Sequence, residues 1–247
     1  MSRRPLSLPR RSSAPIPPAP AAGRRSCVLL LSGGLDSATC LALVTRWGWN
    51  VHALSFDYGQ RHRVELRAAR ALAKRYRVSS HRVIAIPSFG ALGGSALTDR
   101  SIRVPKKALG KPGIPATYVP ARNTLFLAFA LGAAETAGAT EIVIGANVLD
   151  YSGYPDCRPA FLRAFERAAN LGTKAGEEGR RFSIRAPLLR MTKADIVRLA
   201  LSLGLDPGLT TSCYDPSPSG KPCGSCDSCL LRAKGFAEAG AKDPRTR

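Results

Sequence analysis

The chain has 247 residues, of which 37 are Lys or Arg and 17 are Asp or Glu, so its formal net charge is +20. Hydrophobic residues at 45% and charged residues at 22% are the proportions of a globular protein, and they exclude a wholly disordered chain. A membrane-spanning helix needs about 20 apolar residues, far more than the longest apolar run, residues 125–134. We therefore expect no membrane contact, and the surplus positive charge favours polyanionic partners such as nucleic acid or nucleotide phosphates.

Residues 1–25 contain six Arg, six Pro and no acidic residue. Such a segment cannot bury apolar area, so we expect a disordered, basic, proline-rich tail. It has no apolar stretch of the kind found in a signal peptide, and its prolines disfavour the amphipathic helix of a transit peptide. A second flexible tail is expected over residues 241–247.

Strands and helices are expected to alternate after the tail. Short apolar runs typical of buried parallel strands occupy residues 27–31, 51–56 and 83–86. Between them, apolar side chains at helical spacing predict two helices, one through Cys40, Leu43, Val44 and Trp47, the other through Ala69, Leu72, Ala73 and Tyr76. This order predicts a parallel sheet with right-handed crossovers.

A proline-rich segment, residues 87–123, interrupts the alternation, and a patternless stretch of that length is usually functional or mobile. Beyond it the pattern predicts, in order, a helix over 124–137 capped by Asn123, a strand over 141–148, a helix through 161–169 and a strand over 182–188. A helix from Thr192 to Leu203 follows, opened by a capping box of the form Thr192-x-x-Asp195, and a closing helix covers 229–239. The predicted fold class is α/β, with a doubly wound parallel sheet over residues 26–205.

The hexapeptide Ser32-Gly33-Gly34-Leu35-Asp36-Ser37 lies directly between the first strand and the first helix. Its glycines let successive N–H groups point into one concavity, and the helix start adds its positive dipole end, so the turn can cradle phosphate. The spacing is neither Walker A nor Gly-x-Gly-x-x-Gly. The hexapeptide is similar to the pyrophosphate loop of N-type ATP pyrophosphatases, which implies that Asp36 helps to hold Mg²⁺ while Ser32 and Ser37 bond phosphate oxygens.

Four further polar segments are candidates for the binding site, since ligands of open α/β sheets lie beyond the carboxyl ends of the strands. They contain Asp57, Gln60 and Arg61 after the second strand, Arg122 before a helix, Ser152, Gly153, Tyr154, Asp156 and Arg158 after the fourth strand, and Lys193 after the fifth. Arg122 suits a forked contact with phosphate or carboxylate. The alternative is that Asp57 caps a helix and that Arg122 and Lys193 are solvated. Cys157 has no His near it in sequence, which disfavours covalent catalysis.

Four of the seven cysteines crowd into the spacing Cys213-x9-Cys223-x2-Cys226-x2-Cys229. Four thiolates at this spacing fit a tetrahedral Zn²⁺ site, and four protein ligands leave no open position, so the zinc would be structural. An iron–sulfur cluster is the alternative, although the isolated cysteine precedes the run instead of following it. The cluster indicates a reducing compartment and a zinc-binding segment over residues 206–240.

From about residue 27 to residue 236 the chain resembles the 7-cyano-7-deazaguanine synthase family of queuosine biosynthesis. The matching parts are the phosphate-cradling hexapeptide, residues 56–62, 114–123 and 151–158, Lys193 with the two residues 195–196, and the four C-terminal cysteines. The resemblance implies an ATP-pyrophosphatase domain of the adenine nucleotide alpha hydrolase-like fold, a small zinc knuckle, a homodimer and a cytoplasmic enzyme. One departure is Val148, where many members of the family carry an acidic residue.

The resemblance also implies an ATP-dependent ligase that converts 7-carboxy-7-deazaguanine and ammonia to the nitrile, through an adenylated carboxylate and an adenylated amide. Nucleotide contacts are carried over to Leu31, Ser32, Gly33, Gly34, Leu35, Asp36, Ser37, Ala38, Thr39, Cys40 and Leu41. Phosphate and catalytic roles are carried over to Asp36, Arg122 and Lys193. Substrate contacts are expected at Asp57, Gln60, Arg61, Ser152, Gly153, Tyr154, Asp156 and Arg158.

Two alternative functions remain open. One is another pyrophosphate-loop enzyme that thiolates or lysinylates tRNA, which the basic charge favours, although a thiolase would need a cysteine pair near the loop. The other is a zinc-containing nucleic-acid-binding protein that uses the basic surface. This alternative does not explain the phosphate-cradling hexapeptide. The motifs assign the basic charge to ATP and a small anionic base, so we expect no direct nucleic-acid partner.

Overall fold

The computed structural model describes residues 16–19, 25–149 and 154–245. Most of the expected basic tail, together with Ser152 and Gly153, therefore lies outside the described residues. Within the described residues, no helix combines the length and the apolar character that crossing a membrane requires.

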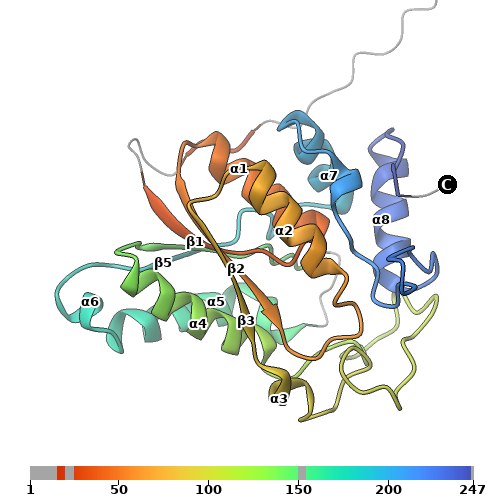
Figure 1. Ribbon diagram of the computed structural model, residues 1–247, viewed down its shortest axis with the longest axis horizontal. Coiled ribbons are helices and arrows are strands. Elements are labelled where there is room, and N and C mark those ends of the chain that lie inside the picture. Colours follow the sequence, from red (N-terminus) through yellow and green to blue (C-terminus); the bar gives the residue numbers. More distant parts are fainter. Residues whose placement is uncertain (1–15, 20–24, 150–153, 246–247) are drawn as a thin grey trace, which may run out of the picture.

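The elements follow the order expected of alternating strands and helices (Figure 1). They are β1 (Ser26–Leu30), α1 (Leu35–Arg46), β2 (Asn50–Asp57), α2 (Glu65–Arg75), β3 (Ser80–Ala85), α3 (Pro87–Gly90), α4 (Arg122–Thr136), β4 (Glu141–Val143), η1 (Pro155–Cys157), α5 (Pro159–Leu171), α6 (Lys174–Glu177), β5 (Ser183–Arg185), α7 (Lys193–Ser202), η2 (Pro207–Leu209) and α8 (Asp227–Glu238).

The strands described pair in parallel in the order β3-β2-β1-β4-β5. Chain connections run outward from β1 to β3 and then return through α4 to β4, so the direction of winding reverses between β1 and β4. Figure 1 shows α1, α2 and α7 on one face of the sheet, with α4 and α5 on the other. The predicted doubly wound α/β class is confirmed.

Alternating side chains of β1 supply the two halves of the core. Cys27 and Leu29 face the cluster formed with α1, α2 and α7. Val28 and Leu30 face the cluster formed with α4 and α5. Because both faces of the strand are buried, β1 consists of a continuous apolar run and not of an alternating pattern.

The structure corrects three details of the sequence prediction. β4 ends at Val143 instead of residue 148, since the chain then passes over α1, where a side chain on Gly145 would approach the Ser37 nitrogen to 3.0 Å. Asn123 is not a cap; it lies inside α4, and Ala121 precedes the helix with a left-handed φ of 53°. Two short helices, α3 and α6, were not predicted. The predicted capping box of α7 is present, with Thr192 and Asp195 bonded reciprocally.

Candidate active site

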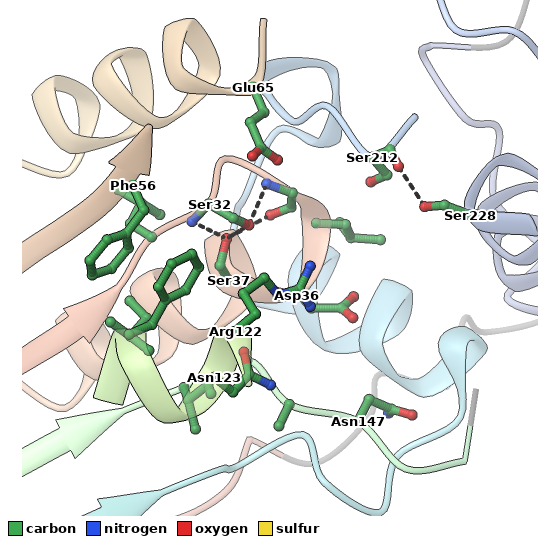
Figure 2. A pocket seen from close by; sticks show the side chains of 18 of the residues that line it. Ser32, Asp36, Ser37, Phe56, Glu65, Arg122, Asn123, Asn147, Ser212 and Ser228 are labelled. Atoms are coloured by element: carbon green, nitrogen blue, oxygen red, sulfur yellow. Dashed lines mark hydrogen bonds between the residues drawn. The ribbon is translucent and has the colours of Figure 1, made fainter. Parts of the chain in front are cut away.

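A cavity of about 260 Å³ opens where the carboxyl ends of β1, β2 and β4 meet. This is where the winding of the sheet reverses, the place at which open α/β folds bind ligands. The phosphate-cradling loop, the start of α4, the start of α7 and the segment before α8 all contribute to its walls. Segments that are far apart along the chain therefore converge on one hollow (Figure 2).

The loop between β1 and α1 is held by its own hydroxyl groups. The Ser32 hydroxyl accepts a hydrogen bond from the Gly34 N–H at 3.2 Å, and the Ser37 hydroxyl donates to the Gly34 carbonyl at 3.1 Å. Gly33 has a φ of 89°, and a Cβ there would lie 2.3 Å from the Glu65 carbonyl oxygen. Glycine is thus required at this position both by conformation and by the close approach of α2.

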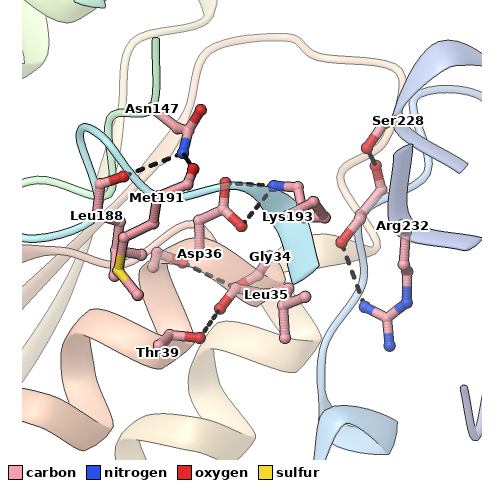
Figure 3. A network of polar contacts seen from close by, with 12 residues as sticks. Gly34, Leu35, Asp36, Thr39, Asn147, Leu188, Met191, Lys193, Ser228 and Arg232 are labelled. Atoms are coloured by element: carbon pink, nitrogen blue, oxygen red, sulfur yellow. Dashed lines mark hydrogen bonds and ion pairs between the residues drawn. The ribbon is translucent and has the colours of Figure 1, made fainter. Parts of the chain in front are cut away.

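Asp36 and Lys193 meet at the edge of the cavity although they are far apart in sequence. The Lys193 ammonium lies 2.8 Å from Oδ1 and 2.9 Å from Oδ2 of Asp36 (Figure 3). Asn147 fixes the turn that precedes α7, because its amide donates to the Leu188 carbonyl at 3.0 Å and the Met191 carbonyl at 2.6 Å. A cation and a carboxylate are therefore held next to the phosphate-cradling loop.

Arg122 enters the cavity from the first turn of α4 and faces the loop. Asp156 orders this helix start, since its carboxylate accepts the Asn123 N–H at 3.0 Å and replaces a capping side chain. The Asn123 amide in turn donates to the Asp156 carbonyl and to the Cys157 sulfur, both at 3.2 Å. The predicted residue Arg122 thus lies in the cavity. Asp156 does not line the cavity, and it stabilises the start of the helix that carries Arg122.

Aromatic side chains form a flat wall of the cavity. The rings of Phe56 and Phe126 stack with centroids 3.9 Å apart and planes within 6°. Tyr58 packs edge-on against Phe126 at 5.4 Å. Tyr154, a predicted substrate residue, lines the same cavity and shares a 2.7 Å hydrogen bond with the Thr117 hydroxyl. Such a wall can hold a planar heterocycle by stacking.

Several predicted site residues do not line this cavity. Gln60 is buried and bonds the Tyr58 N–H at 2.8 Å and the Phe56 carbonyl at 2.9 Å. Arg61 donates to the Asp99 carbonyl at 2.6 Å, and Asp57 pairs with Arg63. The other members are Gly33, Ala38, Thr39, Cys40 and Leu41, which lie behind the cavity wall, and Asp156 and Arg158. Their contacts with a nucleotide or substrate stay predictions.

Other residues of the cavity were not among the predicted site residues. His62 and Glu65 line it from the turn into α2, and Thr211, Ser212 and Arg232 line it from the C-terminal segment. Of these residues, only His62 and Glu65 could have been found from the sequence, because they follow the second strand at the edge where ligands bind.

Burial perturbs both titratable groups of that turn. It raises the pKa of the Glu65 carboxyl to about 8, an effect that a hydrogen bond from Gln60 and the charge of Arg122 partly oppose. Burial, together with the positive charge of Arg122, lowers the pKa of His62 to about 3. Near neutral pH, His62 is therefore uncharged and Glu65 is close to its titration point.

The four C-terminal cysteines converge, with their sulfur atoms all within 4.8 Å of one another. Tetrahedral Zn–S bonds of about 2.3 Å place sulfur atoms about 3.8 Å apart, close to the 4.0 Å between Cys213 and Cys226. The N–H groups of Asp215 and Cys223 donate to the Cys213 sulfur at 3.3 and 3.2 Å, which favours a thiolate. The cluster fits a metal ion such as zinc.

A family model described as "Queuosine biosynthesis protein QueC" matches residues 26–240. The chain belongs to the QueC family. Two relatives, both named 7-cyano-7-deazaguanine synthase, are each 59% identical to it: that of Anaeromyxobacter sp. (strain Fw109-5) covers 89% of this chain and 95% of its own length, and that of Geotalea daltonii covers 90% and 96%. A third with the same name, from Azotobacter vinelandii, is 58% identical over 89% of this chain and 97% of its own length. The matched range includes every residue of the QueC cavity described above.

Proposed function

We propose that this chain is a 7-cyano-7-deazaguanine synthase, an ATP-dependent ligase that converts 7-carboxy-7-deazaguanine and ammonia to the nitrile and releases AMP and pyrophosphate. The observation that carries the proposal is the cavity in which the loop of residues 32–37, the cationic side chains of Arg122 and Lys193 and a stacked aromatic wall face one another. The names of the relatives at 58–59% identity support the same reaction.

The loop of residues 32–37 suits the phosphates of ATP. Its backbone N–H groups and the start of α1 attract anionic oxygens, and Arg122 and Lys193 bring two positive charges to the same hollow. In an adenylation the carboxylate of the substrate attacks the α-phosphate while pyrophosphate leaves. We propose that Arg122 and Lys193 stabilise the negative charge that develops on these phosphates. The loop would hold the phosphates in line with the attacking carboxylate.

Mg²⁺ fits the site through Asp36. A magnesium ion bound with a nucleotide takes one or two protein carboxylates and completes its shell with phosphate oxygens and water. Asp36 offers such a carboxylate at the rim of the cavity, where Lys193 holds it in place at 2.8 Å. When bound, Mg²⁺ would neutralise phosphate charge.

The aromatic wall of Phe56, Phe126 and Tyr154 suits a flat heterocycle. We propose that one of the two planar groups of the reaction, the adenine or the deazaguanine, stacks there, with the carboxylate directed toward Arg122. After the first adenylation, ammonia displaces AMP to give the amide. A second adenylation, on the amide oxygen, lets AMP leave as the nitrile forms.

The cysteine cluster is assigned a structural zinc ion. Four sulfur ligands within 4.8 Å of one another leave no position for a substrate. Residues 104–108 pack against the cluster: the Lys107 N–H donates to the Ser225 carbonyl at 3.0 Å, and the Ala108 N–H to the Asp227 carboxylate at 2.9 Å. The metal would thereby fasten the long connection before α4 to the C-terminal segment.

The reaction itself tests the proposal. The protein is incubated with ATP, Mg²⁺, ammonium and 7-carboxy-7-deazaguanine, and mass spectrometry should detect the nitrile together with AMP and pyrophosphate. A parallel reaction without ammonium should stop at the adenylate. Absence of the nitrile, with ATP-dependent incorporation of label into added tRNA, would instead support the tRNA-modifying alternative.

The assembly and the location are part of the proposal. The resemblance to the family supports a homodimer, which light scattering on the eluted protein would detect as twice the mass of the 26.3 kDa chain. The close thiols of the cysteine cluster support a reducing, cytoplasmic compartment. Migration at the mass of one chain would contradict the dimer without affecting the proposed reaction.

A further inference from the structure

The amide-forming step of the proposed reaction needs a proton acceptor. Near neutral pH ammonia exists mostly as ammonium, which has no lone pair with which to attack a carbonyl carbon. A side chain that takes its proton must lie in the cavity and must gain and lose a proton near the working pH. The inference that follows rests on the proposed function and identifies this side chain.

Most titratable groups of the cavity do not meet this requirement. Asp36 has both carboxylate oxygens bound to the Lys193 ammonium. Burial raises the pKa of the Tyr58 hydroxyl to about 12 and the pKa of the Cys157 thiol to about 11, so both stay protonated. His62 is held uncharged by its burial and by Arg122, and it retains a proton too weakly to compete for one near neutral pH.

Glu65 has the required position. It is the first residue of α2, its side chain is 12% exposed, and it lines the cavity. Figure 2 shows the side chain pointing from α2 toward the phosphate-cradling loop, on the side of the cavity opposite Arg122. The close packing of Gly33 against the Glu65 backbone fixes α2 relative to the loop, so the carboxyl group is held in the cavity beside residues 32–37.

The contacts of Glu65 leave one carboxyl oxygen available. Oε1 accepts the Gln60 side-chain amide at 3.1 Å and lies 3.5 Å from the His62 ring. Among the residues that the structure describes, none donates a hydrogen bond to Oε2. The charged and titratable groups that act on the carboxyl group are Arg122 from α4, with Tyr58 and His62 from its own side of the cavity.

We propose that Glu65 is the general base that takes a proton from ammonium as its nitrogen attacks the adenylated carboxylate. The proton moves to a Glu65 oxygen, and the freed lone pair forms the C–N bond. The C–O bond to AMP then breaks and its electron pair leaves on the AMP phosphate. The second proton lost from nitrogen passes to solvent, as does the one on Glu65, which restores the carboxylate.

The test compares two nucleophiles in Glu65→Gln, a change that keeps the shape and the acceptor for Gln60. Ammonium must lose a proton before it attacks, whereas hydroxylamine is already uncharged at neutral pH. We expect amide and nitrile formation from ammonium to fall about 10²–10⁴-fold, while hydroxamate formation from hydroxylamine and carboxylate-dependent ATP–pyrophosphate exchange stay within about threefold of the parent. Glu178→Gln, the same change at an exposed side chain on the surface, should leave all three rates unchanged.

The outcomes separate three explanations. Equal losses with both nucleophiles would overturn the proposal and make Glu65 a positioning residue, and no loss with ammonium would overturn it outright. A parent protein without carboxylate-dependent pyrophosphate exchange would instead contradict the proposed function.

The parent protein provides a second measurement that does not depend on a variant. At a fixed ammonium concentration, the rate should rise with pH, reach half of its maximum near pH 8, where the Glu65 carboxyl titrates, and level off above that pH. A rate that keeps rising toward the higher pKa of ammonium itself would mean that free ammonia reacts without this base.

Discussion

Two ionisable side chains, the largely buried Glu65 and the buried Arg232, differ in how completely they are hydrogen-bonded. Arg232 donates to both oxygens of Asp243 at 2.8 and 2.9 Å, to the Thr210 hydroxyl at 2.7 Å and to the Pro207 carbonyl at 3.0 Å. Glu65 accepts one hydrogen bond, from Gln60, and the ring next to it is uncharged. The satisfied group holds the C-terminal segment on the domain, whereas the unsatisfied group is kept available for chemistry.

The cysteine cluster and the loop of residues 32–37 differ in the direction that their polar groups face. The cluster turns its four sulfur atoms toward one another, and backbone N–H groups donate to them. The loop turns Asp36 and the start of α1 outward, into a hollow. Polar groups that stabilise the fold are turned toward partners within the chain, whereas those proposed to bind or react are placed where a ligand can reach them. The following variants test that comparison, from the largest expected effect to the smallest.

The largest effect is expected for Cys226→Ser. Loss of one of four sulfur ligands should release the metal and reduce the free energy of unfolding by about 5 kcal/mol or more, since metal binding and folding of such a segment are coupled. Metal analysis of the purified protein and urea unfolding check this. Ser219→Ala, an exposed position in the same loop, should keep the full metal content. A Cys226→Ser protein with parental metal content contradicts the assignment.

Arg232→Met should come second, with a loss of about 3–5 kcal/mol, because it breaks the buried ion pair with Asp243. Lys234→Met on the same helix removes only an exposed pair with Glu238 and should cost about 0–1 kcal/mol. Replacing both Arg232 and Asp243 by apolar residues should recover most of the loss. Thermal or urea unfolding of the four proteins decides whether the contact is structural.

Asp36→Asn should affect the reaction and leave the fold intact. Removal of one charge at the phosphate site should lower the rate of pyrophosphate release by about 10²–10³-fold. Its matched control is Asp206→Asn, an exposed aspartate at η2 that keeps the oxygen bonded to the Gly208 N–H. Parental turnover in Asp36→Asn would remove this carboxylate from the proposed phosphate site.

The smallest effect concerns Glu65 and has the opposite sign. Folding raises the pKa of this carboxyl group from 4.5 to about 8, so the folded state binds more protons and the parent loses stability as pH rises between these values. Glu65→Gln lacks this slope, so its stability relative to the parent should increase as pH rises from about 4.5 to about 8. Urea unfolding across this pH range measures it, and parallel curves would contradict the burial of a carboxylate.

Sequence reasoning succeeded where the signal was contiguous. The loop of residues 32–37, the four cysteines and the capping box of α7 each occupy one stretch of no more than 17 residues, so spacing alone indicates their geometry. The position of Arg122 and Lys193 in the cavity could be predicted because each begins a helix at the carboxyl edge of the sheet.

The remaining roles depend on contacts that sequence spacing does not encode. Gln60 and Arg61 have the chemistry of ligand-binding residues, but neighbouring backbone carbonyls take their donors. The low-polarity surroundings that perturb Glu65 come from the packing of α2 on the loop at Gly33. The end of β4 at Val143 follows from the close approach of Gly145 to α1, more than 100 residues earlier in the chain.

The stoichiometry of AMP and nitrile tests the central claim most directly. In a single reaction with ATP, Mg²⁺, ammonium and 7-carboxy-7-deazaguanine, AMP is measured by chromatography and the nitrile by mass spectrometry. Because both the carboxylate and the amide are adenylated in the same cavity, we predict two AMP for each nitrile. One AMP per product, with the reaction ending at the amide, would contradict the account.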